Sequence, residues 1–274
     1  MRHDHFDSLQ LYPTLQYKEL DGLYFAGQVN GTSGYEEAAA QGLIAGINAS
    51  LKLEGKEPLI LKRSEAYIGV LIDDLINKGI RDPYRLLTSR AEYRLLLRSD
   101  NADLRLMKYG FEIGLVSEDR YQKFLEKKEL ITKCMGEFKS KRITPKENDY
   151  LVSINTGTIN SGVSLFELLK RPEVDVLKLV KYLDNNYDKF VLEQVSLEAK
   201  YEGYIKKSMQ DVKKMEKSEN MKIPFDFDYD SLHNLASEAK QKLKEVRPLT
   251  VGQAMRISGV NPADISILTM YLRG

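Results

Sequence analysis

The uneven distribution of glycine and of helical periodicity sets the strongest limit on the fold. Residues 1–62 hold seven of the 18 glycines in the 274-residue chain. From Ser64 to Glu219 charges instead fall on most helical turns, with little strand-like alternation. From Ile223 onward a shorter stretch with three prolines is again typical of helices. We therefore predict a mainly α fold with three regions, residues 1–62, 63–222 and 223–274.

Composition excludes several classes of protein. Apolar residues make up 42% of the chain and charged residues 30%, as in globular proteins, and no apolar run reaches the roughly 20 residues that span a bilayer. The first residues carry charges where a signal peptide has its apolar stretch. We therefore predict a cytoplasmic protein without membrane contact. With 41 basic and 40 acidic residues, nucleic-acid binding would need a local basic patch.

The cysteine and histidine content predicts no metal or redox centre. Cys134 is the only cysteine, which excludes an internal disulfide and any multi-cysteine metal site, so we interpret it as structural. His3, His5 and His233 share no ligand spacing, and we interpret them as surface residues.

A glycine-rich loop lies between a predicted strand and a predicted helix. The short apolar run 23–26 favours a buried strand, residues 27–34 form the loop, and a helix is expected over residues 35–49. Such a loop places backbone N–H groups and the positive helix end against a phosphate or a flavin oxygen. The spacing is not GxGxxG, however, so from spacing alone we favour a tight strand-to-helix connection over a cofactor site.

Two aspartates lie beside the apolar stripe of the next predicted helix. The helix is expected to begin at Ser64 and to end at Gly79. Asp73 and Asp74 lie beside its stripe, but adjacent residues on a helix point about 100° apart. We therefore favour a solvated face for this pair over acid–base or metal chemistry.

Arginines are concentrated directly after this helix. Residues 78–98 contain six basic and two acidic side chains, a local charge of +4. Ser89 and Glu92 form a capping-box pattern that predicts a helix from Arg90, with Arg90, Arg94 and Arg98 on one face. Guanidinium groups suit phosphate contacts, and ion pairs with neighbouring helices are the alternative.

The last part of the chain predicts one long helix and a short helix pair. Residues 193–219 form a nearly glycine-free stretch with lysines that we expect to be solvated. Thr250 and Asn261 are the expected N-caps of the two short helices. Their apolar side chains are either a docking surface or core. The candidate docking residues are Met255, Ile257, Ile265 and Leu268.

Several long motifs together resemble one family of tRNA-modifying enzymes. Residues 22–42, 82–98 with 100–103, 200–205, and 256–260 with 263–267 are similar to segments of the tRNA uridine 5-carboxymethylaminomethyl modification enzyme family, MnmG or GidA. The resemblance covers residues 12 to 272. It implies an FAD-dependent, NADH-using homodimer that works with the GTPase MnmE and methylenetetrahydrofolate on the wobble uridine of tRNA.

The family's GxGxxG fingerprint and catalytic cysteines have no counterpart in this sequence. The resemblance therefore implies a helical C-terminal region preceded by the last strand–loop–helix of an α/β FAD-binding domain. Such a piece contains no catalytic residue and is expected to be inactive alone, supplying tRNA and partner binding. The alternative is a free-standing helical adaptor that binds RNA or protein without redox activity.

The resemblance also implies roles for individual residues. Gln28 is placed where the family contacts FAD, and the loop around it would supply backbone donors. The implied FAD-binding residues are Gln28, Gly27, Gly31, Thr32 and Gly34. The implied tRNA-binding residues are Arg85, Arg90, Arg94 and Arg98. The apolar residues of the helix pair become candidates for binding the GTPase.

Overall fold

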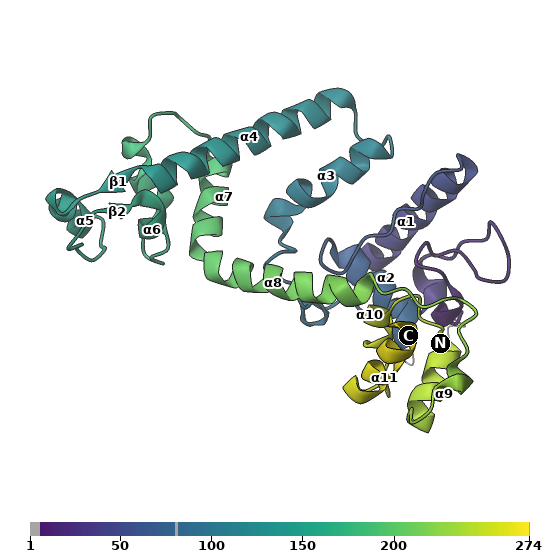
Figure 1. Ribbon diagram of the computed structural model, residues 1–274. Helices are drawn as coiled ribbons and strands as arrows, with labels where there is room; N and C mark the ends of the chain where they lie inside the picture. Colours follow the sequence, from purple (N-terminus) through teal and green to yellow (C-terminus); the bar gives the residue numbers. More distant parts are fainter. Residues whose placement is uncertain (1–5, 80–81, 274) are drawn as a thin grey trace. The chain divides into compact units, whose positions relative to one another are not determined.

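The computed structural model describes residues 6–79 and 82–273, and it divides the chain into two compact units. The first unit comprises Met1–Arg94 together with Met209–Gly274, and the second comprises Leu95–Ser208. Helices dominate both units (Figure 1), which confirms the predicted mainly α fold class. The predicted region boundaries at residues 62 and 222 both fall inside the first unit, so the structure divides the chain differently.

The first unit is built from helices of both chain ends. They are α1 Tyr35–Leu53, α2 Tyr67–Lys78, α9 Ser237–Val246, α10 Val251–Ala254 and α11 Pro262–Arg273, together with α8 Glu202–Glu219 from residue 209 onward. One apolar core lies between α1, α2 and the N-terminal segment, around Leu15, Ile44 and Leu75. A second core, around Tyr229 and Leu268, joins α9 to α11.

Helix α2 shows how the apolar pattern is used. The predicted stripe packs into the first core, with Leu71 and Leu75 almost fully buried. The helix ends as predicted at Gly79, whose φ of +65° favours glycine. It begins at Tyr67 rather than at Ser64, because residues 62–65 form a turn in which the Glu65 amide donates to the Lys62 carbonyl.

The predicted strand over residues 23–26 is reduced to a single bridge. Tyr24 pairs with Gln16 in an isolated antiparallel bridge, and the chain then enters a short 3₁₀ turn, Gly27–Asn30. Within the described residues no further strand pairs with this segment, so it forms no sheet. The following helix α1 is present as expected and extends to Leu53.

The second unit is a helical domain with one short hairpin. Its helices are α3 Ala102–Glu112, α4 Glu118–Ser140, α5 Asn148–Ser153, α6 Leu165–Leu169 and α7 Lys189–Lys200. Strands β1 Arg142–Ile143 and β2 Val163–Ser164 pair antiparallel, with Ile143 opposite Val163. The core contains the fully buried Cys134, which is therefore a structural residue. Burial raises the pKa of its thiol to about 12, with a smaller effect from Glu137.

The long helix predicted over residues 193–219 is two helices. Helix α7 ends before Tyr201, and α8 covers Glu202–Glu219. The buried apolar stripe of α7 stops at Ala199, whereas α8 has no fully buried residue. The lysines of α8 are solvated as predicted. Among the described residues, no helix combines the length and the apolar character needed to cross a membrane.

Candidate functional site

The glycine-rich loop is organised around the buried side chain of Gln41 from α1. Its Oε1 accepts hydrogen bonds from the Gly27 amide (3.1 Å) and from Nδ2 of Asn30 (2.8 Å). Its Nε2 donates to Oγ1 of Thr32 (3.0 Å), which itself donates to the Gly27 carbonyl (2.9 Å). One glutamine therefore holds both ends of the loop. The sequence analysis did not predict a role for Gln41. A single polar residue among the small residues of this helix could have indicated one.

The predicted FAD-binding residues lie in two different environments. Gly27 and Thr32 are buried in the Gln41 network, and Gly31 has a φ of +75° that favours glycine. Gln28 is exposed, and its side chain forms no hydrogen bond with any described residue. Gly34 immediately precedes α1, where a Cβ would overlap the Glu37 carboxylate.

The polar groups of this loop fit a hydrogen-bonding cofactor. The amide side chain of Gln28 is free to donate and accept, and the buried Oδ1 of Asn30 lacks a hydrogen-bond partner among the described residues. Neither group carries a charge. The loop therefore offers neutral hydrogen-bonding groups to a ligand.

The arginine segment is hydrogen-bonded directly to this loop. The Tyr84 amide donates to the Gly31 carbonyl (2.8 Å), and the Ser33 amide donates to the Tyr84 carbonyl (3.0 Å). These bonds form a parallel bridge between Thr32 and Tyr84. The Leu86 amide donates to Oε1 of Glu37 at 2.9 Å. The glycine-rich loop and the arginine segment, about 50 residues apart in sequence, are thus joined by backbone hydrogen bonds.

A buried ionic cluster fixes the other side of the segment. Arg63 is 8% exposed and pairs with Asp74 (Nη1 to Oδ1, 2.7 Å) and with Glu92 (Nη2 to Oε1, 2.8 Å). The phenolic group of Tyr84 donates to Oδ2 of Asp74. The solvated face predicted for Asp73 and Asp74 is therefore wrong, because Asp74 is buried and both carboxylates pair with Arg63.

The cluster shifts the titration of its buried members. Burial raises the pKa of Asp74, but the hydrogen bond from Lys78 and the charge of Arg63 outweigh it and hold this pKa below its usual range. Burial and the adjacent Asp74 carboxylate raise the pKa of Tyr84 far above its usual range. Asp74 is therefore a charged and Tyr84 a neutral member of the cluster at physiological pH.

The helix predicted from Arg90 is absent. Residues 88–90 form a 3₁₀ turn, and the chain continues as turns until Ser99. The capping box fails because the Glu92 carboxylate binds Arg63 instead of reaching the backbone of Ser89. Without a helix, Arg90, Arg94 and Arg98 do not form the predicted row on one face.

The four predicted tRNA-binding arginines differ in their availability. Arg85 and Arg94 are exposed, and their side chains form no hydrogen bond or ion pair with the described residues. Arg90 lies over the Tyr84 ring at 4.4 Å, and its Nε donates to the Arg85 carbonyl. Arg98 belongs to the second unit, where its nearly buried side chain binds Asp100 and Glu198. Arg98 is therefore a structural ion-pair partner.

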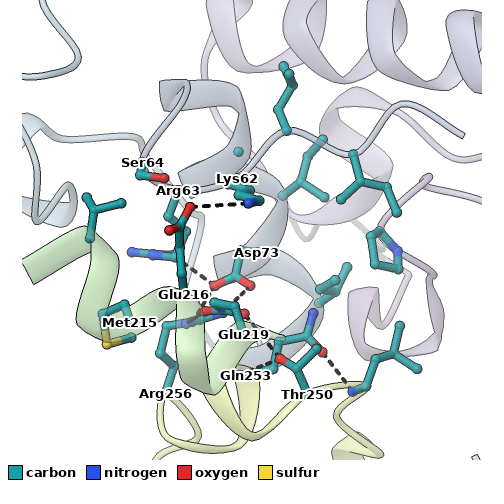
Figure 2. A pocket seen from close by; sticks show the side chains of 18 of the residues that line it. Lys62, Arg63, Ser64, Asp73, Met215, Glu216, Glu219, Thr250, Gln253 and Arg256 are labelled. Carbon is teal, nitrogen blue, oxygen red and sulfur yellow. Dashed lines mark hydrogen bonds and ion pairs between the residues drawn. The ribbon is translucent and has the colours of Figure 1, made fainter. Parts of the chain in front are cut away.

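A cavity of about 440 Å³ lies in the first unit beside the ionic cluster of Arg63, Asp73 and Glu92 (Figure 2). Its walls are mainly aliphatic, and charged side chains line one side. Arg256 pairs with Asp73 (Nη2 to Oδ1, 2.8 Å) and with Glu219, and Lys62 pairs with Glu216. Each charged side chain among the described lining residues thus has an ionic partner.

The predicted docking residues of the helix pair divide between core and surface. Ile257 and Leu268 are buried in the second core, and Ile265 packs against it. Met255 is 44% exposed. Ile257 and Leu268 are therefore core residues, a correction to their proposed contact role. The predicted caps are present, since Thr250 accepts the Gln253 amide and Asn261 accepts the Ala263 amide.

Comparisons with known proteins identify one family along the chain. Family models match residues 1–57 ("Glucose inhibited division protein A"), 118–209 ("tRNA modifying enzyme MnmG/GidA C-terminal helical domain") and 211–274 ("tRNA modifying enzyme MnmG/GidA C-terminal helical bundle"). The MnmG of Clostridium kluyveri is 54% identical over 277 residues, and that of Bacillus licheniformis is 56% identical over 276 residues. Each alignment covers 99% of this chain and 44% of the relative.

Solved structures show the same likeness. GidA of Aquifex aeolicus in the form II crystal superimposes with a TM-score of 0.85 at 43% identity, over 98% of this chain and 43% of that chain. The form I crystal gives a TM-score of 0.82 at 44% identity, over 98% and 42%. The chain thus spans less than half of the length of the proteins that it matches.

Proposed function

The chain belongs to the MnmG/GidA family and corresponds to its C-terminal part, and from this premise we propose that it supplies tRNA and partner binding rather than chemistry. The reaction would be the FAD-dependent, NADH-using installation of a carboxymethylaminomethyl group at C5 of the wobble uridine. The GTPase MnmE and methylenetetrahydrofolate would take part, and the complete enzyme would be a cytoplasmic homodimer. These finer assignments rest on the resemblance of the motifs.

The availability of two arginines on a fixed segment carries the tRNA-binding proposal. Arg85 and Arg94 are exposed and unpaired among the described residues. The backbone is anchored before Arg85 by Tyr84, and between the two arginines by the contacts of Arg63 with Glu92 and the Arg90 carbonyl. A phosphate contact gains most when the cation is free and its backbone is already ordered, because less conformational entropy is then lost on binding. We assign these two arginines to phosphate contacts.

The loop before α1 is assigned to the cofactor. FAD, when bound, supplies the redox chemistry of the enzyme, and this chain orients it through Gln28 and the surrounding backbone. The exposed and unpaired Gln28 amide supports this assignment. A neutral hydrogen bond of this kind contributes about 1 kcal/mol. Replacement of Gln28 by Ala is expected to weaken FAD binding by about that amount, which titration of the apoenzyme measures.

The test of the tRNA assignment is a salt titration. In the complete enzyme, with the N-terminal part that longer relatives carry, Arg85→Ala with Arg94→Ala is expected to weaken tRNA binding. Each lost phosphate contact lowers the slope of log K against log salt by about 0.7–0.9. Lys56→Ala, at an exposed lysine of the same unit, is the control. An unchanged slope in the double variant would remove both arginines from the interface.

A further inference from the structure

The bridge between the glycine-rich loop and the arginine segment joins two sites that the proposed function treats separately. We infer that this bridge, with Glu37 as its positioning residue, couples cofactor binding at the loop to RNA binding by Arg85 and Arg94. The inference rests on the proposed function. It concerns how the two binding events influence each other, and the contacts that carry it all lie within the first unit.

Glu37 contacts both sides of the bridge. It is 6% exposed on the first turn of α1. Its Oε1 accepts the Leu86 amide, which lies next to Arg85. The same carboxylate packs against Gly34 so closely that a Cβ there would overlap it. A movement of the loop end therefore displaces the acceptor that holds the arginine segment.

The backbone gives the coupling a second path. The Gly31 carbonyl accepts the Tyr84 amide, and the Tyr84 carbonyl accepts the Ser33 amide. Gly31 and Ser33 flank the residue whose hydroxyl, that of Thr32, belongs to the Gln41 network. A shift of residues 27–34 on ligand binding is thus transmitted to Tyr84 through two backbone hydrogen bonds.

The far side of the arginine segment cannot absorb such a movement. Tyr84 is held by Asp74, while Arg63 donates to the Arg90 carbonyl (3.2 Å) and binds Glu92. The segment is therefore restrained at both ends by buried groups. A ligand that displaces the loop therefore changes the position of the arginine segment, and this couples the two binding events.

The experiment measures the tRNA dissociation constant of the complete enzyme with and without bound FAD. Wild-type protein is expected to bind tRNA at least about five-fold more tightly when FAD is bound. Glu37→Ala removes the acceptor of the Leu86 amide and is expected to bring this ratio close to one. Glu37→Gln retains an acceptor oxygen and is expected to preserve the ratio. Glu36→Ala is the matched control, because Glu36 is the exposed neighbour on the same turn.

Hydrogen exchange gives a readout that does not depend on RNA. Bound FAD is expected to slow exchange of the Tyr84 and Leu86 amides in the wild type, and the Leu86 effect is expected to disappear in Glu37→Ala. A wild-type ratio of one, an unchanged ratio in Glu37→Ala, or FAD-independent exchange at both amides would overturn the coupling. If Glu37→Ala fails to fold, the wild-type exchange decides alone. The salt slope of the double variant Arg85→Ala with Arg94→Ala tests the proposed tRNA contacts, and it does not test the coupling.

Discussion

The phenolic oxygen of Tyr84 lies 2.9 Å from Oδ2 of Asp74, and both side chains are buried. Tyr84→Phe retains the ring beneath Arg90 but leaves one carboxylate oxygen of Asp74 without this donor. We expect the free energy of unfolding to fall by about 1–3 kcal/mol. Urea denaturation measures the change, and Tyr35→Phe, at a residue that is 94% exposed, is expected to leave stability unchanged. Equal stabilities of the two variants would contradict the role of this bond.

Asp74 should also set part of the acid sensitivity. Its pKa is lowered in the folded state, so the stability that it contributes is fully present above its unfolded pKa of about 3.9. This contribution is lost as the pH falls below about 4 through the lower folded pKa. Asp74→Asn is expected to cost about 1–3 kcal/mol at pH 7, because Arg63 loses one buried partner but keeps Asp73 and Glu92. Below pH 4, the free energy of unfolding of the variant should fall less steeply with decreasing pH than that of the wild type. Denaturant titrations at several pH values measure this difference.

Arg98 provides a contrast with the exposed arginines. It is 13% exposed in its side chain and pairs with Asp100 and Glu198 in the second unit. Arg98→Ala is expected to lower the stability of that unit by about 1–3 kcal/mol while the salt slope of tRNA binding stays unchanged. Calorimetric melting and tRNA titration separate the two effects. A reduced slope with full stability would make Arg98 a phosphate contact instead.

Two glycines of the same region should respond oppositely to alanine. Gly34→Ala introduces a Cβ that overlaps the Glu37 carboxylate, and we expect a loss of about 1–3 kcal/mol. Gly46→Ala lies on the exposed face of α1 with no atom within 4 Å of the new Cβ, and we expect a gain of up to about 1 kcal/mol. Denaturation midpoints of the two variants compare them directly. A neutral Gly34→Ala would show that Glu37 moves freely.

Cys134 should be unreactive in the folded protein. Burial raises its pKa to about 12, so the thiolate is scarce at pH 8 and inaccessible. Alkylation by iodoacetamide is expected to be much slower in buffer than in denaturant, with intact mass as the readout. Rapid labelling of the folded chain would indicate that the core of the second unit, which contains Cys134, opens frequently.

Local signals in the sequence were sufficient for several helix boundaries. Gly79, Thr250 and Asn261 stop or start helices as predicted, because capping depends on residues within one turn. The assignment of mainly helical structure rests on the same short-range periodicity.

The ionic cluster could not be predicted in this way. Asp73 pairs with Arg256, which is 183 residues away, and Glu92 pairs with Arg63 instead of completing a capping box with Ser89. The favoured solvated face and the expected helix from Arg90 both failed for this reason. Pairing between distant residues leaves no trace in helical periodicity. The same limit concealed the bridge between Thr32 and Tyr84.

The ion pair between Asp73 and Arg256 has a consequence for the order of events during synthesis. The first unit is assembled from both ends of the chain, and the whole second unit is encoded between them. A ribosome must therefore translate residues 95–208 before Arg256, the second ion-pair partner of Asp73, becomes available. We expect the second unit to fold first on the nascent chain. Until Arg256 emerges, the Asp73 carboxylate on α2 lacks this ion-pair partner.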